Sequence, residues 1–316
     1  MKNIICFIIF CAFFIYHGKV ISQFKNSNIT CTYQTSWGEE GEGELQFKEP
    51  NAISASPDGN IYIADTGNQR IQKLNPLGEF VQEAGGFGWG GEEFDKPVSL
   101  CTRNGLDVYV ADYNNHRIKR YDKDLNYLAS IYTSEDVSSE LKFSYPLDVT
   151  ISDQGELFCL DGDNIRILKL NLNAEPQLSF GDYDAGIGRL YEPLKMCILQ
   201  SSFIYVSDRG KQAIMVFDIY GNYLFQIGVG KLQAPSGVSL IDLQYLLVTD
   251  YDQKLVFIFT TRGRLITQID RRNYTGNSFQ KPMDVCFHNN RIFVLDKSAC
   301  RIDVFNISFN TGHSEE

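Results

Sequence analysis

Apolar residues occur in short runs along this chain, and polar turns separate the runs. Typical runs are residues 61–64 (IYIA) and 108–111 (VYVA), each followed by an aspartate, a polar turn and a second run that begins with arginine. A turn near a glycine (Gly78, Gly221 or Gly263) then leads to another run. Because no helical spacing intervenes, these runs predict β-strands, four to each unit.

A proline with Phe or Leu three residues before it marks the start of each unit. The six prolines are Pro50, Pro97, Pro146, Pro193, Pro235 and Pro282, at intervals of 47, 49, 47, 42 and 47 residues. An aspartate follows each proline at a nearly constant offset, namely Asp65, Asp112, Asp161, Asp208, Asp250 and Asp296. A repeat of about 45 residues with four strands is typical of a propeller blade. The predicted fold is therefore all-β, a six-bladed β-propeller of four-stranded blades.

The two ends of this region indicate how the ring closes. The sixth unit stops after its third predicted strand, at residues 301–305, and residues 32–37 have the pattern of a fourth strand without a unit of its own. A solenoid would need polar caps at its ends, and neither end of the repeats supplies one. We therefore expect residues 32–37 to complete the last blade, which also covers a strand edge that would otherwise promote aggregation.

The first 22 residues have the pattern of a secretory signal peptide. Lys2 precedes thirteen nearly unbroken apolar residues, whereas a membrane span needs about 20. We expect cleavage before Gln23; an uncleaved anchor is the alternative. The expected organisation is a signal peptide at 1–22, a short segment at 23–31, the propeller at 32–306 and a tail at 307–316, with no membrane span in the mature chain.

If this interpretation is right, the protein is secreted, extracellular and glycosylated. Sequons at Asn28, Asn273 and Asn306 fit an exported chain. The formal charge of the 316-residue chain is −10. Loss of Lys2 and Lys19 with the signal peptide makes the mature charge −12. This charge argues against nucleic acid as a partner, because phosphate contacts need clustered Lys and Arg.

The cysteines give little support for a metal or redox site. Cys101, Cys197 and Cys286 each lie four residues after a repeat proline, in alternate units, where the other units have Ser or Thr. They are too far apart to pair with one another, and a small buried slot explains them. Disulfides are possible and their connectivity is open; Cys286 with Cys300 is the nearest pairing. No CxxC spacing occurs.

Two segments resemble a known family. They are PNAISASPDGNIYIADTGNQRIQKL, which begins at Pro50, and PVSLCTRNGLDVYVADYNNHRIKRY, which begins at Pro97. Both are similar to the repeat of the NHL-repeat β-propellers, and units three to six match more loosely. The resemblance extends over residues 32–306 and implies the six-bladed form that is usual in the family.

The family includes an enzyme and nucleic-acid binders. The peptide-amidating lyase has a related propeller in which three histidines hold zinc, but the blades of this chain contain only His116 and His288. We expect these two on opposite faces, where they cannot share a metal. NHL domains that bind RNA use a basic face, which the charge of this chain opposes.

The repeat aspartates have a structural and a functional interpretation. Arginine follows the aspartate by five residues in four units, as Arg70, Arg117, Arg166 and Arg301. A ring of acidic ligands is the functional interpretation. We favour the structural one, in which Asp and Arg meet across the turn and form a partly buried pair, because repetition in every blade indicates a requirement of the fold.

The turn after the second strand and the linker between blades emerge on one side of a propeller, here called the linker face. Four of the six linkers are acidic, which gives this face a charge polarity. Solubility alone would explain it; the functional alternatives are docking of a basic peptide or a protein, or Ca²⁺ binding by carboxylates. The predicted binding residues are Glu39, Glu40, Glu92, Glu93, Tyr113, Asn114, His116, Asp182, Arg209, Tyr251 and Asp252.

The sequence thus favours a secreted monomer that binds a protein or peptide through the acidic linker face, and a basic partner would match the charge of that face. No cofactor is expected apart from the Ca²⁺ alternative. The second hypothesis is a divergent propeller enzyme, a metal-dependent lyase or hydrolase. No residue of the chain marks a general acid or base for it.

Overall fold

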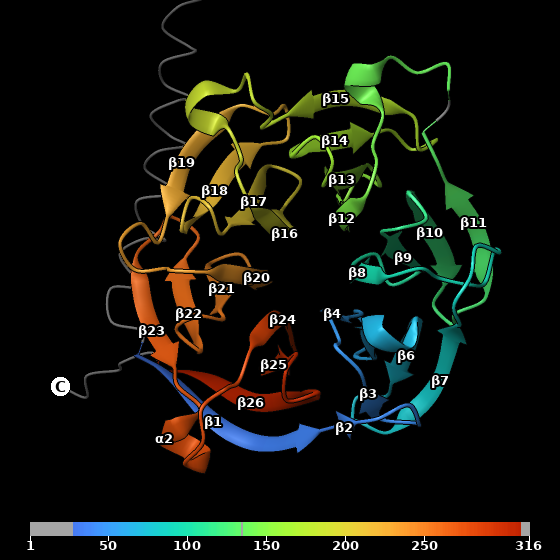
Figure 1. Cartoon of the computed structure of the whole chain (residues 1–316). Coiled ribbons are helices and arrows are strands. Elements are labelled where there is room, and N and C mark those ends of the chain that lie inside the picture. Colours follow the sequence, from blue (N-terminus) through green and yellow to red (C-terminus); the bar gives the residue numbers. More distant parts are fainter. Residues whose placement is uncertain (1–27, 134, 311–316) are drawn as a thin grey trace, which may run out of the picture.

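Six four-stranded antiparallel sheets surround a central axis in the computed structural model, which describes residues 28–133 and 135–310 (Figure 1). The predicted all-β six-bladed propeller is confirmed. In blades 1 to 5 the strands follow one another in sequence order from the axis outward. The expected signal peptide, residues 1–22, lies outside the described residues. Among those described, no helix is long and apolar enough to cross a membrane.

The first three blades span the first half of the chain. Blade 1 consists of β4 (Ala52–Ala55), β5 (Ile61–Asp65), β6 (Arg70–Leu74) and β7 (Phe80–Gly85). Blade 2 consists of β8 (Pro97–Cys101), β9 (Asp107–Asp112), β10 (Arg117–Asp122) and β11 (Tyr127–Ile131). Blade 3 consists of β12 (Pro146–Ile151), β13 (Leu157–Asp161), β14 (Arg166–Leu170) and β15 (Pro176–Phe180).

The other three blades follow the same plan, except that the last takes a strand from the beginning of the chain. Blade 4 consists of β16 (Pro193–Leu199), β17 (Phe203–Asp208), β18 (Ala213–Asp218) and β19 (Tyr223–Ile227). Blade 5 consists of β20 (Pro235–Ile241), β21 (Tyr245–Asp250), β22 (Leu255–Thr260) and β23 (Leu265–Ile269). Blade 6 consists of β24 (Pro282–His288), β25 (Arg291–Asp296), β26 (Arg301–Asn310) and β1 (Asn28–Trp37).

Short elements occupy the connections. The linker into blade 1 contains β2 (Glu39–Glu40) and β3 (Gln46–Phe47), and a 3₁₀ turn, η1 (Thr66–Asn68), joins β5 to β6. The linkers into blades 3, 4 and 6 contain η2 (Ser139–Leu141), η3 (Gly186–Gly188) and α2 (Arg272–Thr275).

The apolar side chains pack between neighbouring blades. One cluster joins blades 6 and 1, with Phe293 and Ile302 on one side and Ile53 and Ile63 on the other. Five further clusters join the remaining neighbours around the ring. Inner strands are therefore covered on both faces, and β5, for example, is buried along its whole length, whereas an outer strand such as β7 alternates between half-buried and exposed residues.

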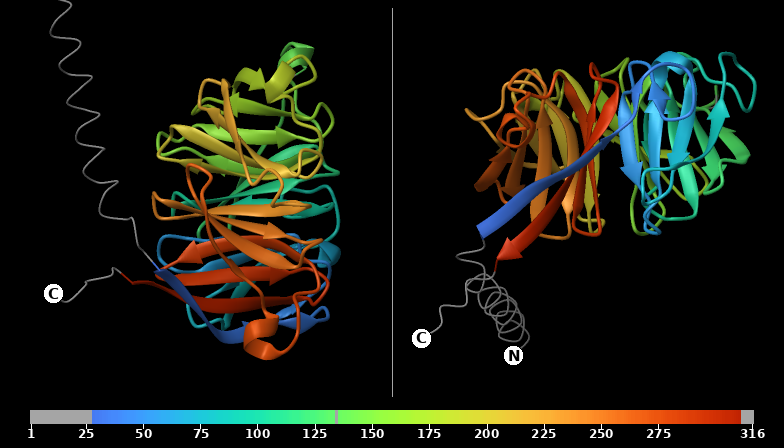
Figure 2. Two further views of the ribbon diagram at one scale, coloured as in Figure 1. Left: turned by 90° about the vertical axis from the view of Figure 1, so that its left-hand side faces the viewer. Right: turned by 90° about the horizontal axis from the view of Figure 1, so that it is seen from below.

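The ring closes as predicted. Strand β1 pairs antiparallel with β26, with Trp37 opposite Ile302 and Cys31 opposite Ile307, and the register shifts between Tyr33 and Thr35. Figure 2 shows these two strands side by side. The pairing begins before residue 32 and continues past residue 306, so the strands are longer than the sequence pattern indicates.

A buried carboxylate fixes the closing strand. Asp303, which is fully buried, accepts a hydrogen bond from Ser36 Oγ at 2.5 Å and one from Arg271 Nε at 3.0 Å. Trp37 packs against Phe293, with ring centroids 5.6 Å apart. Arg301, the fourth predicted partner of a repeat aspartate, lies closer to Asp303 (3.2 Å) than to Asp296 (3.8 Å).

The repeat aspartates hold the linkers in place. In blade 2, Asp112 accepts a hydrogen bond from the backbone N–H of Asp95 at 2.9 Å and from Arg117 Nε at 2.8 Å. The same arginine donates to the carbonyl oxygens of Trp89, Gly90 and Glu93 in the linker. The pair therefore ties the turn after the second strand to the linker that enters the blade, an arrangement that fits the structural interpretation.

The same contact recurs in every blade, with or without the arginine. Asp65 and Asp161 pair with Arg70 and Arg166 at 2.8 and 3.3 Å. Where blade 5 has Leu255 in place of arginine, Asp250 instead accepts the backbone N–H groups of residues 233, 234 and 253. Asp208 and Asp296 also accept two linker N–H groups each.

We predict that Asp112→Ala destabilises the fold by about 3–5 kcal/mol, because the change leaves the buried cation Arg117 without its anion. Lys119, fully buried 3.9 Å from Asp112, loses the same partner. Urea unfolding of the variant measures the effect, with the exposed Asp163→Ala as control. An unchanged unfolding midpoint would show that the pair does not hold the linker.

We predict that removal of residues 1–37 causes concentration-dependent association, because it uncovers the backbone edge of β26. Removal of residues 1–27 keeps β1 and is the matched control. Light scattering across a concentration series distinguishes the two. If the shorter chain stays monomeric with an unchanged melting temperature, β1 does not close the ring in solution.

Candidate functional site

The predicted acidic residues lie at the periphery of the linker face. Glu39 and Glu40 are exposed in β2, and Glu92 and Glu93 are exposed in the linker into blade 2. Asp182 is half-buried in the linker into blade 4. Glu39 and Glu40 follow β1, the outermost strand of blade 6, and the linker that carries Glu92 and Glu93 meets Tyr127 of the outermost strand β11 at Gly91. These carboxylates therefore lie toward the outer rim.

The predicted residues of blade 2 form an aromatic cluster nearer the axis. The rings of Tyr113 and Tyr145 lie 5.1 Å apart, and His116 meets Tyr145 edge-on at 4.1 Å. Lys96 Nζ lies 4.2 Å from the ring centroid of Tyr113, within cation–π distance. Asn114 donates a hydrogen bond to a carboxylate oxygen of Asp95 at 2.8 Å, so its side chain supports the linker.

A second cluster joins blades 4, 5 and 6. Arg209 donates to Glu192 at 2.6 Å and to the hydroxyl of Tyr251 at 2.5 Å. Lys281 lies over the ring of Tyr251, 5.0 Å from its centroid. The neighbouring Asp252 is exposed. The structure thus brings Arg209 and Tyr251 together, while Tyr113 and His116 belong to the other cluster.

Lysines gather at the centre of the linker face. Lys297 donates to Asn51 Oδ1 at 3.3 Å and lies 3.8 Å from Glu49. Burial lowers the pKa of Lys297, and the positive charges of Lys281, Lys96 and the more deeply buried Lys195 lower it further. The linker face is therefore acidic at its rim and basic around the axis, a division that the charge count of the linkers did not reveal.

A layer of three charged side chains crosses the axis below this basic centre. Lys195 in β16, Asp148 in β12 and Asp284 in β24 occupy the same repeat position, two residues after the blade proline, and all three are buried. Lys195 Nζ lies 3.8 Å from Asp148 Oδ1 and donates to the carbonyl oxygen of Val98 across the axis at 2.9 Å. The layer therefore joins inner strands of blades that are not neighbours.

The two carboxylates of the layer have different surroundings. Asp148 accepts hydrogen bonds from Ser99 Oγ and from the backbone N–H of Met196 (2.6 Å) and lies beside Lys195. Among the described residues, Asp284 accepts only from the backbone N–H groups of residues 53 and 285, at 3.0 and 2.9 Å. Burial raises the pKa of both groups, and the pKa of Asp284 reaches about 6.

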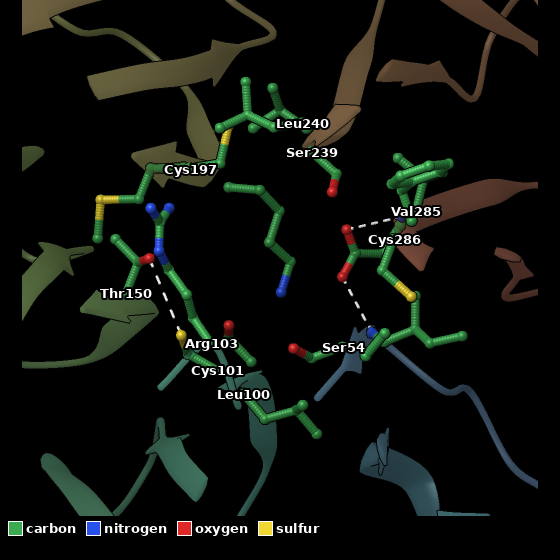
Figure 3. Close-up of a pocket in the computed structure, with 18 of the residues that line it drawn as sticks. Ser54, Leu100, Cys101, Arg103, Thr150, Cys197, Ser239, Leu240, Val285 and Cys286 are labelled. Atoms are coloured by element: carbon green, nitrogen blue, oxygen red, sulfur yellow. Dashed lines mark hydrogen bonds between the residues drawn. The ribbon is translucent and has the colours of Figure 1, made fainter. Parts of the chain in front are cut away.

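A cavity of about 310 Å³ extends from the charged layer along the axis, away from the linker face. Figure 3 shows small polar side chains around it, four residues after each blade proline: Ser54, Cys101, Thr150, Cys197, Ser239 and Cys286. Arg103, in the turn after β8, and His288, the last residue of β24, lie two residues further along the chain, at the mouth. The cavity therefore opens on the side where the first and second strands of each blade connect, here called the turn face.

The cysteines of the cavity are protonated thiols. Burial raises the pKa of Cys101 and Cys197, and it raises that of Cys286 well above its ordinary value. All six described cysteines are free, so no disulfide joins Cys286 to Cys300, the nearest of the pairings that the sequence left open. The described residues contain no group of three or more His, Cys, Asp or Glu side chains that could hold a metal ion.

Comparison with known proteins supports the repeat assignment. The family model of the NHL repeat matches residues 47–74 and 94–121, which are the two segments that carry the sequence resemblance. The chain carries NHL repeats. In addition, 59 residues are 39% identical to B-box type zinc finger protein ncl-1 of Caenorhabditis elegans; they amount to 19% of this chain and only 7% of that protein.

Solved propellers resemble the whole propeller of this chain in fold. Virginiamycin B lyase from Staphylococcus aureus superposes with a TM-score of 0.59 at 12% identity, covering 89% of this chain and 99% of that one. A streptogramin B lyase gives 0.58 at 13% identity, covering 90% and 98%. A Bacteroides thetaiotaomicron protein of unknown function gives 0.62 at 14% identity, covering 90% and 77%. At these identities the likeness concerns the fold alone.

The charged layer was missed by the sequence analysis, although a signal for it exists. Alignment of the units on their prolines places Ala52, Ser99, Asp148, Lys195, Gly237 and Asp284 in one column. This column varies in charge, whereas the column two residues later is uniformly small. An asymmetric site can form at a repeat position where the residue type differs from blade to blade.

We predict that Asp284 makes the protein less stable as the pH rises from 4 to about 6. In this range the folded protein retains a proton that the unfolded chain, with an ordinary carboxyl pKa of 3.8, has already lost. Folding therefore takes up a proton, and its free energy becomes less favourable by up to about 3 kcal/mol across the range.

Urea unfolding at several pH values measures this slope. In Asp284→Asn the slope is expected to decrease, and in the exposed Asp252→Asn it is expected to match the unaltered protein. Equal slopes in all three proteins would show that Asp284 ionises normally in the fold.

Proposed function

We propose that this propeller is an extracellular binding module that recognises a protein or peptide across its linker face. The observation that carries the proposal is the convergence of Tyr113, Tyr145 and Tyr251 with lysines around the axis on that face. Tyrosine offers a large, rigid contact area with a polar tip, and it is enriched where proteins bind partners.

The charge pattern indicates what the partner presents. Lys96 and Lys281 are close enough to Lys297 to lower its pKa, and Glu49 is the exposed carboxylate that pairs with Lys297, at 3.8 Å. The positive charges outnumber this carboxylate, so the centre favours an acidic group of the partner. The rim carboxylates, such as Glu92 and Glu93, favour basic residues around it. Complementary charges of this kind set the orientation and association rate of a complex more than its affinity.

Two further features of the chain fit an extracellular setting. The first 22 residues have the signal-peptide pattern, and the sequon residues Asn273 (in α2) and Asn306 (in β26) are exposed. The side chain of Asn28 lies outside the described residues. We do not assign to this chain the lyase activity named for the structural neighbours, since the similarity extends to the fold only.

We predict that charge reversal weakens the binding of the partner in two distinct ways. After partner capture from extracellular fluid, Lys96→Glu with Lys281→Glu is expected to lower affinity at least tenfold through faster dissociation, because these residues lie at the centre. Glu92→Lys with Glu93→Lys is expected to slow association and reduce its salt dependence, because the rim acts by steering. Surface plasmon resonance separates the two rates.

The matched controls reverse one charge of each sign on the turn face, as Lys123→Glu and Glu79→Lys, both at exposed positions. They are expected to leave both rates unchanged. If the control variants impair binding as much as the central pair does, the partner docks elsewhere and the proposal fails.

A further inference from the structure

The axial cavity is separate from the proposed docking surface. It opens on the turn face, and the charged layer of Asp148, Lys195 and Asp284 lies between it and the linker face. Its volume of about 310 Å³ is at the lower end for small-molecule sites. A ligand of a few heavy atoms fits such a space, whereas a folded partner does not.

The net charge at the floor of the cavity is negative. Lys195 is 3.8 Å from Asp148, so the positive charge of Lys195 neutralises the negative charge of Asp148. Asp284 has no cation within 4.0 Å among the described residues, and two backbone N–H groups are its partners. The nearest cation, Lys195, is shared with Asp148 and lies beyond 4.0 Å from Asp284, so its attraction only partly offsets the cost of burying Asp284. A ligand that brings a second positive charge would offset the rest of that cost.

The neighbouring backbone makes room for Asp284. Blade 5 has Gly237 at the repeat position where Asp284 stands in blade 6. A Cβ atom on Gly237 would lie 2.6 Å from both the Cα atom and the Oδ1 atom of Asp284, closer than atoms can approach. The glycine therefore allows the carboxylate to reach its place beside the axis.

We propose that the axial cavity binds a small primary ammonium compound, with the ammonium group on Asp284. The walls supply hydroxyl groups that accept N–H donors, such as that of Ser239, and soft, uncharged thiols that contact a short carbon chain. A quaternary ammonium is less suitable, because it requires a cage of aromatic rings and the lining has only Phe287 and His288.

The residues at the mouth of the cavity suggest two kinds of primary amine as ligands. Arg103 lies there, with one guanidinium nitrogen 2.8 Å from Asp153 and another donating to the carbonyl oxygen of Ile198. A simple alkylamine would use Asp284 alone. An amino acid would also present a carboxylate to Arg103. Both share the ammonium on which the proposal depends.

Isothermal titration calorimetry at pH 7.5 tests the proposal with n-butylammonium chloride and serine as probes. Neutral n-butanol and tetramethylammonium chloride are the comparison compounds. The unaltered protein is expected to bind a primary amine at least tenfold more tightly than either comparison compound. Tighter binding of serine than of butylammonium would support the amino-acid form, and the reverse would support the alkylamine form.

Asp284→Asn is expected to weaken amine binding at least tenfold, and Asp242→Asn, an exposed change on the turn face, is expected to leave it unchanged. Ser239→Leu fills the cavity without touching the carboxylate and provides a second test if Asp284→Asn fails to fold. Absence of amine binding, equal binding of butanol, or full binding in both cavity variants would overturn the proposal. None of these outcomes bears on the binding of a partner to the linker face, which is expected to be unchanged in the cavity variants.

Discussion

The hydrogen bonds between each repeat aspartate and the linker before it are the contacts on which the rest of the propeller depends. Each linker must turn into the interior just before a proline, and its last N–H groups are then shielded from water. A buried N–H without an acceptor costs about as much as a lost hydrogen bond, and the aspartate supplies that acceptor in every blade. Because the aspartate is held in place, the residue that follows it also has a fixed position around the axis. Such residues are Tyr113, Arg209, Tyr251 and Lys297.

The inner strands have the same backbone structure in every blade, but their side chains differ. The proposed ligand site forms where these side chains differ between blades. Two residues after the proline, the blades supply two carboxylates, one ammonium, one hydroxyl, one methyl group and one glycine. Because these positions meet across the axis, a difference between blades becomes an asymmetric cluster. The same layer also has a structural role, since Lys195 and Asp148 connect blades 2, 3 and 4.

The two ends of the axis have different chemistry although a continuous set of contacts joins them. On the linker face, Lys297 donates to Asn51, whose amide donates to the carbonyl oxygen of Val98 at 3.0 Å. The same carbonyl accepts from Lys195 in the charged layer. Tyrosines and lysines on the first side suit an extended macromolecular partner, and the narrow cavity that opens on the second side suits a small molecule.

The sequence by itself determined the six blades and the closing strand, and it indicated a structural role for the aspartates. These follow from strand periodicity and from a repeat whose spacing is visible along the chain. Only the tertiary structure decided that the linker face is basic at its centre, that Arg271 rather than Arg301 is the closest guanidinium to Asp303, and that Asp148, Lys195 and Asp284 share one layer. The physical reason is distance: residues 148, 195 and 284 are far apart in sequence, and charge summed over linkers does not say which side chains point toward the axis.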